Sequence, residues 1–208
     1  MIAVIDYDTG NTKSVGKALA HIGLEHVITA DHAVIRSCDG LILPGVGAFA
    51  RAMANIEERG LAVLVKELVS EGKPLLGICV GMQLLFDSSS EYGETSGLGL
   101  IPGAVVRLPP SNLKVPHIGW NQLHVKPATV FAPLDGENVY YVHSYYAKTD
   151  ERYVVAKTDY GVQVPGIVQK QHVYGTQFHP EKSGDVGFKV LQYFKEVVVK
   201  CSSSQQSI

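Results

Sequence analysis

A cysteine in the first half of this sequence lies in a segment whose residue types suit covalent catalysis. Cys79 is the centre of Gly77-Ile78-Cys79-Val80-Gly81, which has the spacing of a nucleophile elbow, a tight strand-to-helix turn that presents a reactive side chain. The glycines leave room for that turn, where a β-carbon would collide with neighbouring backbone. A helix N-terminus also favours the thiolate. The segment predicts a cysteine nucleophile, and a buried structural cysteine is the alternative.

A histidine 100 residues later has the neighbours of a catalytic base. His179 lies in Gln177-Phe178-His179-Pro180-Glu181, at the end of an apolar run. Pro180 ends the predicted strand, so Glu181 can reach back to the imidazole and fix its tautomer. Alone, this tripeptide would be read as a polar turn. Together with the elbow it predicts a Cys-His pair oriented by a carboxylate, which only the fold can assemble.

Two further segments could serve such a nucleophile. Pro44-Gly45-Val46-Gly47 follows an apolar run, and its glycines permit a backbone that aims N–H groups at an oxyanion. The N–H of Val80 is the second expected donor, although 44–47 could be an ordinary turn. Gln83 follows Cys79 by one helical turn, so it could bind an amide or zwitterionic substrate or face solvent.

The elements that must position these residues are read from hydrophobic periodicity. Strands are predicted at 2–6, 25–29, 40–44 and 74–79, alternating with helices at 11–22, 50–58, 61–71 and 81–88, with Asn11 as an N-cap. Strands follow at 104–108, 121–125, 139–147, 153–157, 166–172 and 174–178, then a helix at 184–200. We therefore expect an α/β fold with a doubly wound, mostly parallel central sheet and an antiparallel extension.

Composition limits the functional classes. The 208 residues carry a net charge of −2 without a basic cluster, which argues against nucleic acid or a membrane as partner. Three widely spaced cysteines and scattered histidines predict neither a disulfide framework nor a metal site, and no cofactor motif is found. The chain starts as a strand, not a signal peptide. We expect one domain at 1–200, a flexible tail at 201–208 and a cytoplasmic setting.

Taken together, the motifs resemble those of the class I (triad-type) glutamine amidotransferases, from Ile2 to about Phe194. More narrowly, they are similar to the glutaminase subunits of imidazole glycerol phosphate synthase. The signatures that carry this resemblance are Gly77-Ile78-Cys79-Val80-Gly81-Met82-Gln83, Val115-Pro116-His117-Ile118-Gly119-Trp120-Asn121, Val142-His143-Ser144-Tyr145-Tyr146 and Gly175-Thr176-Gln177-Phe178-His179-Pro180-Glu181-Lys182-Ser183.

The resemblance implies a role for each matching segment. It implies a triad of Cys79, His179 and Glu181, an oxyanion loop at Gly45, Val46 and Gly47, and glutamine contacts from Gln83, His143, Ser144 and Tyr145. It also implies a (β/α)₈-barrel cyclase partner that receives ammonia through a channel, with Lys182 and Asn11 near the interface.

One segment departs from the family pattern, and other functions stay open. In Asp6-Tyr7-Asp8-Thr9-Gly10-Asn11-Thr12, Asp8 replaces the usual glycine and Thr12 the usual leucine, at the predicted active-site end of the first strand. The alternatives are a glutaminase for another amidotransferase, a γ-glutamyl hydrolase or cysteine peptidase on a similar scaffold, and a catalytically silent binding module.

Overall fold

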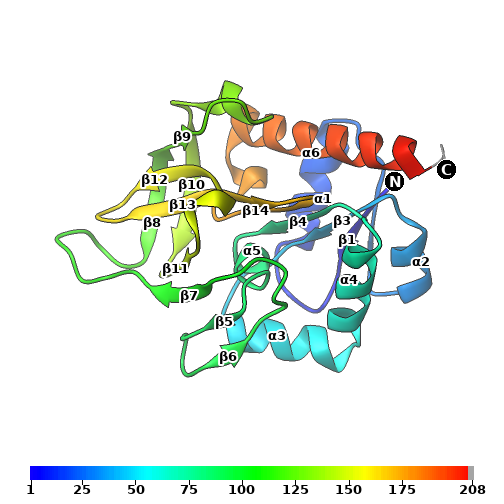
Figure 1. Ribbon diagram of the computed structural model, residues 1–208, viewed down its shortest axis with the longest axis horizontal. Coiled ribbons are helices and arrows are strands. Elements are labelled where there is room, and N and C mark those ends of the chain that lie inside the picture. The colour runs from blue at the N-terminus through cyan, green and yellow to red at the C-terminus, as the bar shows by residue number, and fades with distance from the viewer. Residues whose placement is uncertain (206–208) are drawn as a thin grey trace.

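The computed structural model describes residues 1–205, and its centre is an eight-stranded sheet (Figure 1). Five parallel strands lie side by side in the order β2, β1, β3, β4, β14. They are β1 (Ile2–Ile5), β2 (His26–Thr29), β3 (Gly40–Leu43), β4 (Leu75–Ile78) and β14 (Val173–Thr176). All except β2 are wholly buried, as expected of strands covered on both faces. The predicted parallel sheet is confirmed.

The sheet continues beyond β14 as the predicted antiparallel extension. β14 pairs with β13 (Gln163–Lys170), which is followed by β12 (Val154–Asp159) and β9 (His124–Val125). Two small sheets complete the strands of the second half. One pairs β8 (His117–Gln122) with β10 (Asn138–His143), and the other holds β11 (Tyr145–Lys148), β7 (Ala104–Arg107), β5 (Ser88–Ser89) and β6 (Thr95–Ser96).

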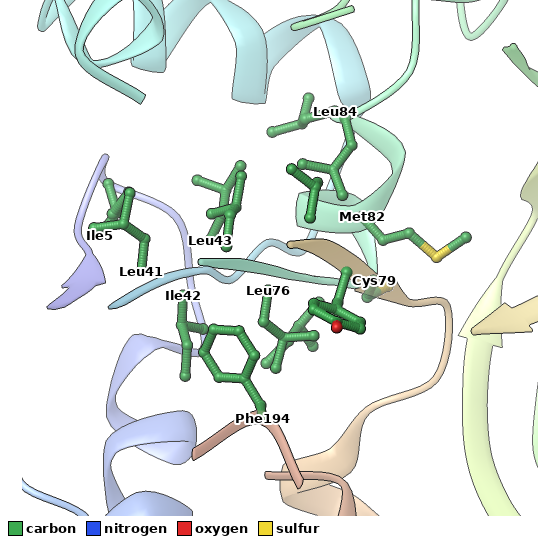
Figure 2. Packing of buried hydrophobic residues seen from close by; sticks show 14 of the residues in the cluster. Ile5, Leu41, Ile42, Leu43, Leu76, Cys79, Met82, Leu84 and Phe194 are labelled. Carbon is green, nitrogen blue, oxygen red and sulfur yellow. The ribbon is translucent and has the colours of Figure 1, made fainter. Parts of the chain in front are cut away.

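Helices cover both faces of the sheet (Figure 1). On one face lie α1 (Thr12–His21) and α6 (Gly184–Gln205), which contact each other, and on the other α3 (Phe49–Glu58) and α4 (Leu61–Ser70). Side chains of β3 alternate between the layers, so Ile42 points towards Phe194 of α6 and Leu43 towards the opposite layer (Figure 2). Short 3₁₀ turns lie at Ala132–Leu134, Glu151–Tyr153 and Pro180–Lys182.

Helix boundaries differ from prediction at three places. The short α2 (His32–Ser37), capped by Asp31, was not predicted. Helix α5 (Val80–Gln83) ends five residues before the predicted position 88, because the carbonyls of residues 84–86 accept hydrogen bonds from the N–H groups of residues 98–101 instead of continuing the helix. The last helix runs through the predicted tail to Gln205, and residues 206–208 lie outside the described chain.

The position of β14 next to β4 decides where the catalytic candidates meet. The two strands are parallel, and Thr176 lies opposite Ile78. Residues that follow both strands therefore emerge at the same carboxyl edge of the sheet, where ligands bind in open α/β sheets. Cys79 follows β4, and His179 follows β14 by three residues.

Candidate active site

The turn at Cys79 has the strained backbone expected of a nucleophile elbow. Cys79 has φ 55° and ψ −110°, a region that residues other than glycine rarely occupy. A β-carbon on Gly81 would lie 1.8 Å from the Leu43 carbonyl oxygen, and one on Gly77 would lie 2.6 Å from the carbonyl oxygen of Gly81. Both glycines are therefore required by the packing of α5 against β3 and β4.

The imidazole of His179 is held by a carboxylate. Its Nδ1 lies 2.7 Å from Oε1 of Glu181, and both side chains are fully buried. Burial lowers the pKa of His179, but the Cys79 sulfur and the Glu181 carboxylate outweigh it and raise that pKa to about 9. For Glu181, burial raises the pKa, and the hydrogen bonds from His179 and Asn11 bring it below its usual value. The pair therefore favours imidazolium and carboxylate at neutral pH.

Cys79 and His179 line one cavity of about 330 Å³, a size that suits a small ligand. Most of the predicted binding residues line the same cavity. They are Val46, Gly47, Val80, Gln83, His143, Ser144 and Tyr145. Gly45 and Glu181 are not part of the lining; Glu181 lies behind His179, as the hydrogen bond requires.

The predicted oxyanion loop is held by a threonine. The N–H of Val46 donates to Oγ1 of Thr9 at 3.3 Å, and that hydroxyl can donate in turn to the Val46 carbonyl at 3.4 Å. In this conformation the Val46 amide is committed to Thr9. Gly47 has φ 92°, a left-handed value that glycine adopts without strain.

The predicted substrate contacts carry a hydrogen-bond network. The Tyr145 carbonyl accepts from Nε2 of Gln83 at 2.9 Å and from Nδ1 of His143 at 3.0 Å, and Nε2 of His143 lies 3.0 Å from Nδ1 of His117. Burial, with His117 nearby, lowers the pKa of His143 to about 3. His143 is therefore an uncharged side chain that lines the cavity, and both its ring nitrogens already have hydrogen-bond partners.

The two predicted interface residues lie in different settings. Lys182 is exposed, with its Nζ 5.9 Å from the centre of the Tyr140 ring. Tyr140 in turn lies 6.0 Å from Trp120, whose side chain is 56% exposed. Asn11 lies at the N-cap of α1 with φ 86°, but its side chain does not cap that helix and donates to Glu181 at 2.7 Å.

Three polar residues in or beside the cavity were not predicted. Glu91 lines it, and Oε2 of Glu91 accepts from the Phe49 N–H at 2.7 Å. The side chain of Gln177 contacts Cys79, and Thr9 bonds to Val46 of the predicted oxyanion loop. Gln177 and Thr9 each lie inside a motif that the sequence singled out, whereas Glu91 lies in a loop with no distinguishing pattern.

The segment of residues 6–12 also forms an ion pair beside the end of α3. Asp8, where the family usually has glycine, has φ 60° and forms an ion pair with Arg59 beside the end of α3. The pair connects the segment that carries Thr9 and Asn11 to the end of α3, and both of its side chains are exposed. No helix in the described part of the chain is both long and apolar enough to cross a membrane.

Comparisons with known proteins identify the family of the chain. The sequence profile of the family described as "Glutamine amidotransferase class-I" matches residues 3–195. The chain is 55% identical to the imidazole glycerol phosphate synthase subunit HisH of Listeria monocytogenes, over 99% of this chain and 100% of that protein. It is 52% identical to the HisH subunit of Bacillus cereus, with complete coverage of both.

Solved structures share the fold at lower identity. A structure described as glutamine amidotransferase superimposes with a TM-score of 0.77 at 22% identity, over 95% of this chain and 99% of that one. PurLQS from Thermotoga maritima gives 0.73 at 21% identity, over 94% and 97%. The sequence matches go further than the shared fold: the chain belongs to the class I glutamine amidotransferases, and among them to the HisH glutaminase subunits of imidazole glycerol phosphate synthase.

Proposed function

We propose that this chain performs the glutamine hydrolysis of its family with Cys79 as nucleophile, His179 as acid and base, and Glu181 as the carboxylate that orients His179. The observation that supports this most is that Cys79 and His179 line the same cavity while Glu181 holds the far nitrogen of the imidazole at 2.7 Å. That arrangement suits covalent catalysis with an activated thiol.

The reaction divides into two half-reactions. The Cys79 thiolate attacks the side-chain carboxamide carbon of glutamine, and the carbonyl π electrons move to oxygen. Collapse of this intermediate breaks the C–N bond, and the nitrogen leaves as ammonia with a proton from Nε2 of His179. Water then attacks the thioester and gives a proton to His179, the C–S bond breaks, and glutamate leaves. Cys79 and His179 end as they began.

Other cavity residues would bind the substrate. Both hydrogens of the Gln83 amide have partners, the Tyr145 carbonyl and the Gln177 amide oxygen, so its own oxygen is the group left to accept from glutamine. Glu91 supplies a carboxylate in the cavity, and a carboxylate is the natural partner of an α-ammonium group. Backbone around Ser144 would complete the site.

The oxyanion donors we propose are the N–H groups of Val80 and of the loop at Gly45, Val46 and Gly47. Each donor should contribute about 10²–10³ in rate. Because the Val46 N–H is bonded to Thr9, we assign this arrangement to a resting state in which the loop must turn before it can serve the oxyanion. Release from Thr9 is then the switched step.

The ammonia would pass to a (β/α)₈-barrel cyclase, the partner inferred for the complex to which this subunit belongs. The exposed residues Ile118, Trp120 and Lys182 are the surface that we assign to that partner, because exposed aromatic and apolar side chains favour interfaces.

We also propose a cytoplasmic, reducing location, which the three free cysteines support.

Ammonia release from glutamine tests the function. We expect slow release by the isolated chain and a large stimulation when the cyclase and its nucleotide ligand are added. A rate for the isolated chain equal to that of the ligand-bound complex would contradict the regulated glutaminase. Stimulation by the partner of another amidotransferase, but not by the cyclase, would contradict the assignment of the partner.

A substitution at Thr9 tests the resting state of the loop without the partner. Thr9→Val removes both hydrogen bonds to Val46 and keeps the shape of the side chain. At about 0.5–1.5 kcal/mol for each hydrogen bond, partly replaced by water, the basal glutaminase rate should rise about two- to tenfold. The measurement is ammonia release without the cyclase. Thr9→Ser keeps the hydroxyl, so its basal rate should stay near that of wild type. A basal rate in Thr9→Val no higher than in Thr9→Ser would contradict the proposal that Thr9 holds the loop in a resting state.

A further inference from the structure

A buried glutamine contacts the sulfur of Cys79 from beneath the cavity. Gln177 follows β14 directly, and its side chain is fully buried. Its Nε2 lies 3.9 Å from Sγ of Cys79, a long contact but within reach of a sulfur acceptor, and its Oε1 accepts from Nε2 of Gln83 at 3.1 Å. The backbone N–H of Gln177 donates to the Gly166 carbonyl at 3.0 Å, so the strand fixes the base of the side chain.

The Tyr145 carbonyl determines which end of Gln177 faces the sulfur. A carbonyl oxygen only accepts, so the Gln83 atom that lies 2.9 Å from it must be the amide nitrogen. That nitrogen must in turn meet the oxygen of Gln177, not its nitrogen. The nitrogen of Gln177 is thereby turned towards Cys79. The orientation of both amides follows from one backbone group and does not depend on distinguishing O from N in either side chain.

A donor in addition to the His179 imidazolium would stabilise the thiolate, because one polar neighbour of the sulfur disfavours a negative charge. The Val142 carbonyl oxygen lies 3.9 Å from Sγ of Cys79. It can accept a hydrogen bond from the thiol, but its dipole repels the thiolate that attacks the substrate. The Gln177 side chain is fully buried, so bulk water does not compete for its N–H.

We propose that Gln177 is a catalytic residue of glutamine hydrolysis: its side-chain N–H donates to the Cys79 sulfur and stabilises the thiolate. The inference rests on the proposed role of Cys79 as nucleophile. Gln177 takes no part in proton transfer. The proton that leaves Sγ goes to Nε2 of His179, and Gln177 keeps both amide protons while the negative charge on sulfur is formed and consumed. Gln83 has a second task in this arrangement, since it holds Gln177 in the donating orientation.

The test is the rate of Cys79 alkylation by iodoacetamide between pH 5 and 9, followed by mass spectrometry of the peptide that contains Cys79. Gln177→Glu keeps an oxygen for Gln83 and replaces the donor with a second oxygen. Gln177→Met removes both polar groups at similar length, and covers the case in which a buried carboxyl prevents folding. Gln169→Met is the matched control, because Gln169 contacts Tyr174 and Gln171 instead of the sulfur.

In the folded Gln177 variants, we expect alkylation at pH 7 about tenfold slower than in wild type and a rate curve displaced to higher pH, as for the loss of a hydrogen bond to a charged group. Glutaminase kcat should fall by a similar factor with little change in KM. Curves that overlay wild type in folded variants would overturn the proposal. Alkylation needs no turnover, so it reports on this contact even if Cys79→Ala were to leave glutamine hydrolysis intact and refute the nucleophile.

Discussion

Replacing Cys79 with alanine should abolish glutamine-dependent synthesis by the complex and leave synthesis from added ammonia intact. The thiol is the atom that we expect to bond to the substrate carbon, because it lines the cavity together with His179. The glutamine-dependent rate should fall by about 10³-fold or more. Added ammonia should bypass the missing step, because ammonia is the product of glutamine hydrolysis that we propose the cyclase takes.

The two nitrogen sources make the experiment specific. Product formation is measured with glutamine and then with ammonium salt at a pH that supplies free ammonia, in the same preparation of the complex. A misfolded variant would fail to bind the cyclase, which gel filtration would detect. Cys38→Ala is a matched control, since Cys38 is also buried but lies outside the cavity. Glutamine-driven synthesis that survives in Cys79→Ala would rule out the nucleophile.

His179→Gln should reduce glutamine hydrolysis by about 10²–10⁴-fold, the usual range for loss of a general acid and base. Glu181→Gln should cost less, because its amide oxygen can still accept from Nδ1 of His179 and keep the ring oriented, although the charge is lost. The measurement is kcat for ammonia release by the stimulated complex. Equal losses in the two variants would contradict the division of roles between proton transfer and orientation.

The same pair should leave a pH signature on stability. Folding raises the pKa of His179 from 6.5 to about 9, so the folded state binds the proton more tightly. The contribution of protonated His179 to the free energy of unfolding is therefore complete below pH 6.5 and is lost as the pH rises through 9. In urea titrations, the stability difference between wild type and Glu181→Gln should narrow over that range, and a constant difference would show that the pair is not charged.

Sequence patterns predicted the elements that are buried on both faces, and missed those set by distant contacts. Strands such as β1 and β3 are uninterrupted apolar runs, which can be recognised in the local sequence alone. The end of α5 cannot be read locally, since it depends on the Leu84 carbonyl accepting from the N–H of Leu98. Helix α2 is only six residues long and presents a single buried side chain, Ile35, too few for a periodic signal.

The candidate site divides in the same way. Motif spacing predicted the cysteine, the histidine and the carboxylate as candidates, and the turn at Cys79 has a local steric requirement, the absence of a β-carbon at Gly81. Gln177 could not be separated from a packing residue, since the preceding strand is buried on both faces and gives no alternation. The partner of Asn11 also escaped prediction: an N-cap pattern identifies a helix start, not a side chain that reaches a carboxylate 170 residues away.

The insertion of β14 between β4 and β13 bears on the order in which the proposed active site is completed during synthesis. A nascent chain that has emerged from the ribosome only to about residue 150 contains Cys79 but neither its base nor the strand that completes the sheet. Strand β4 is then an open edge, available to wrong partners. His179, the base that we propose for the thiol, is translated 100 residues after Cys79, so the proposed pair can form only late in synthesis.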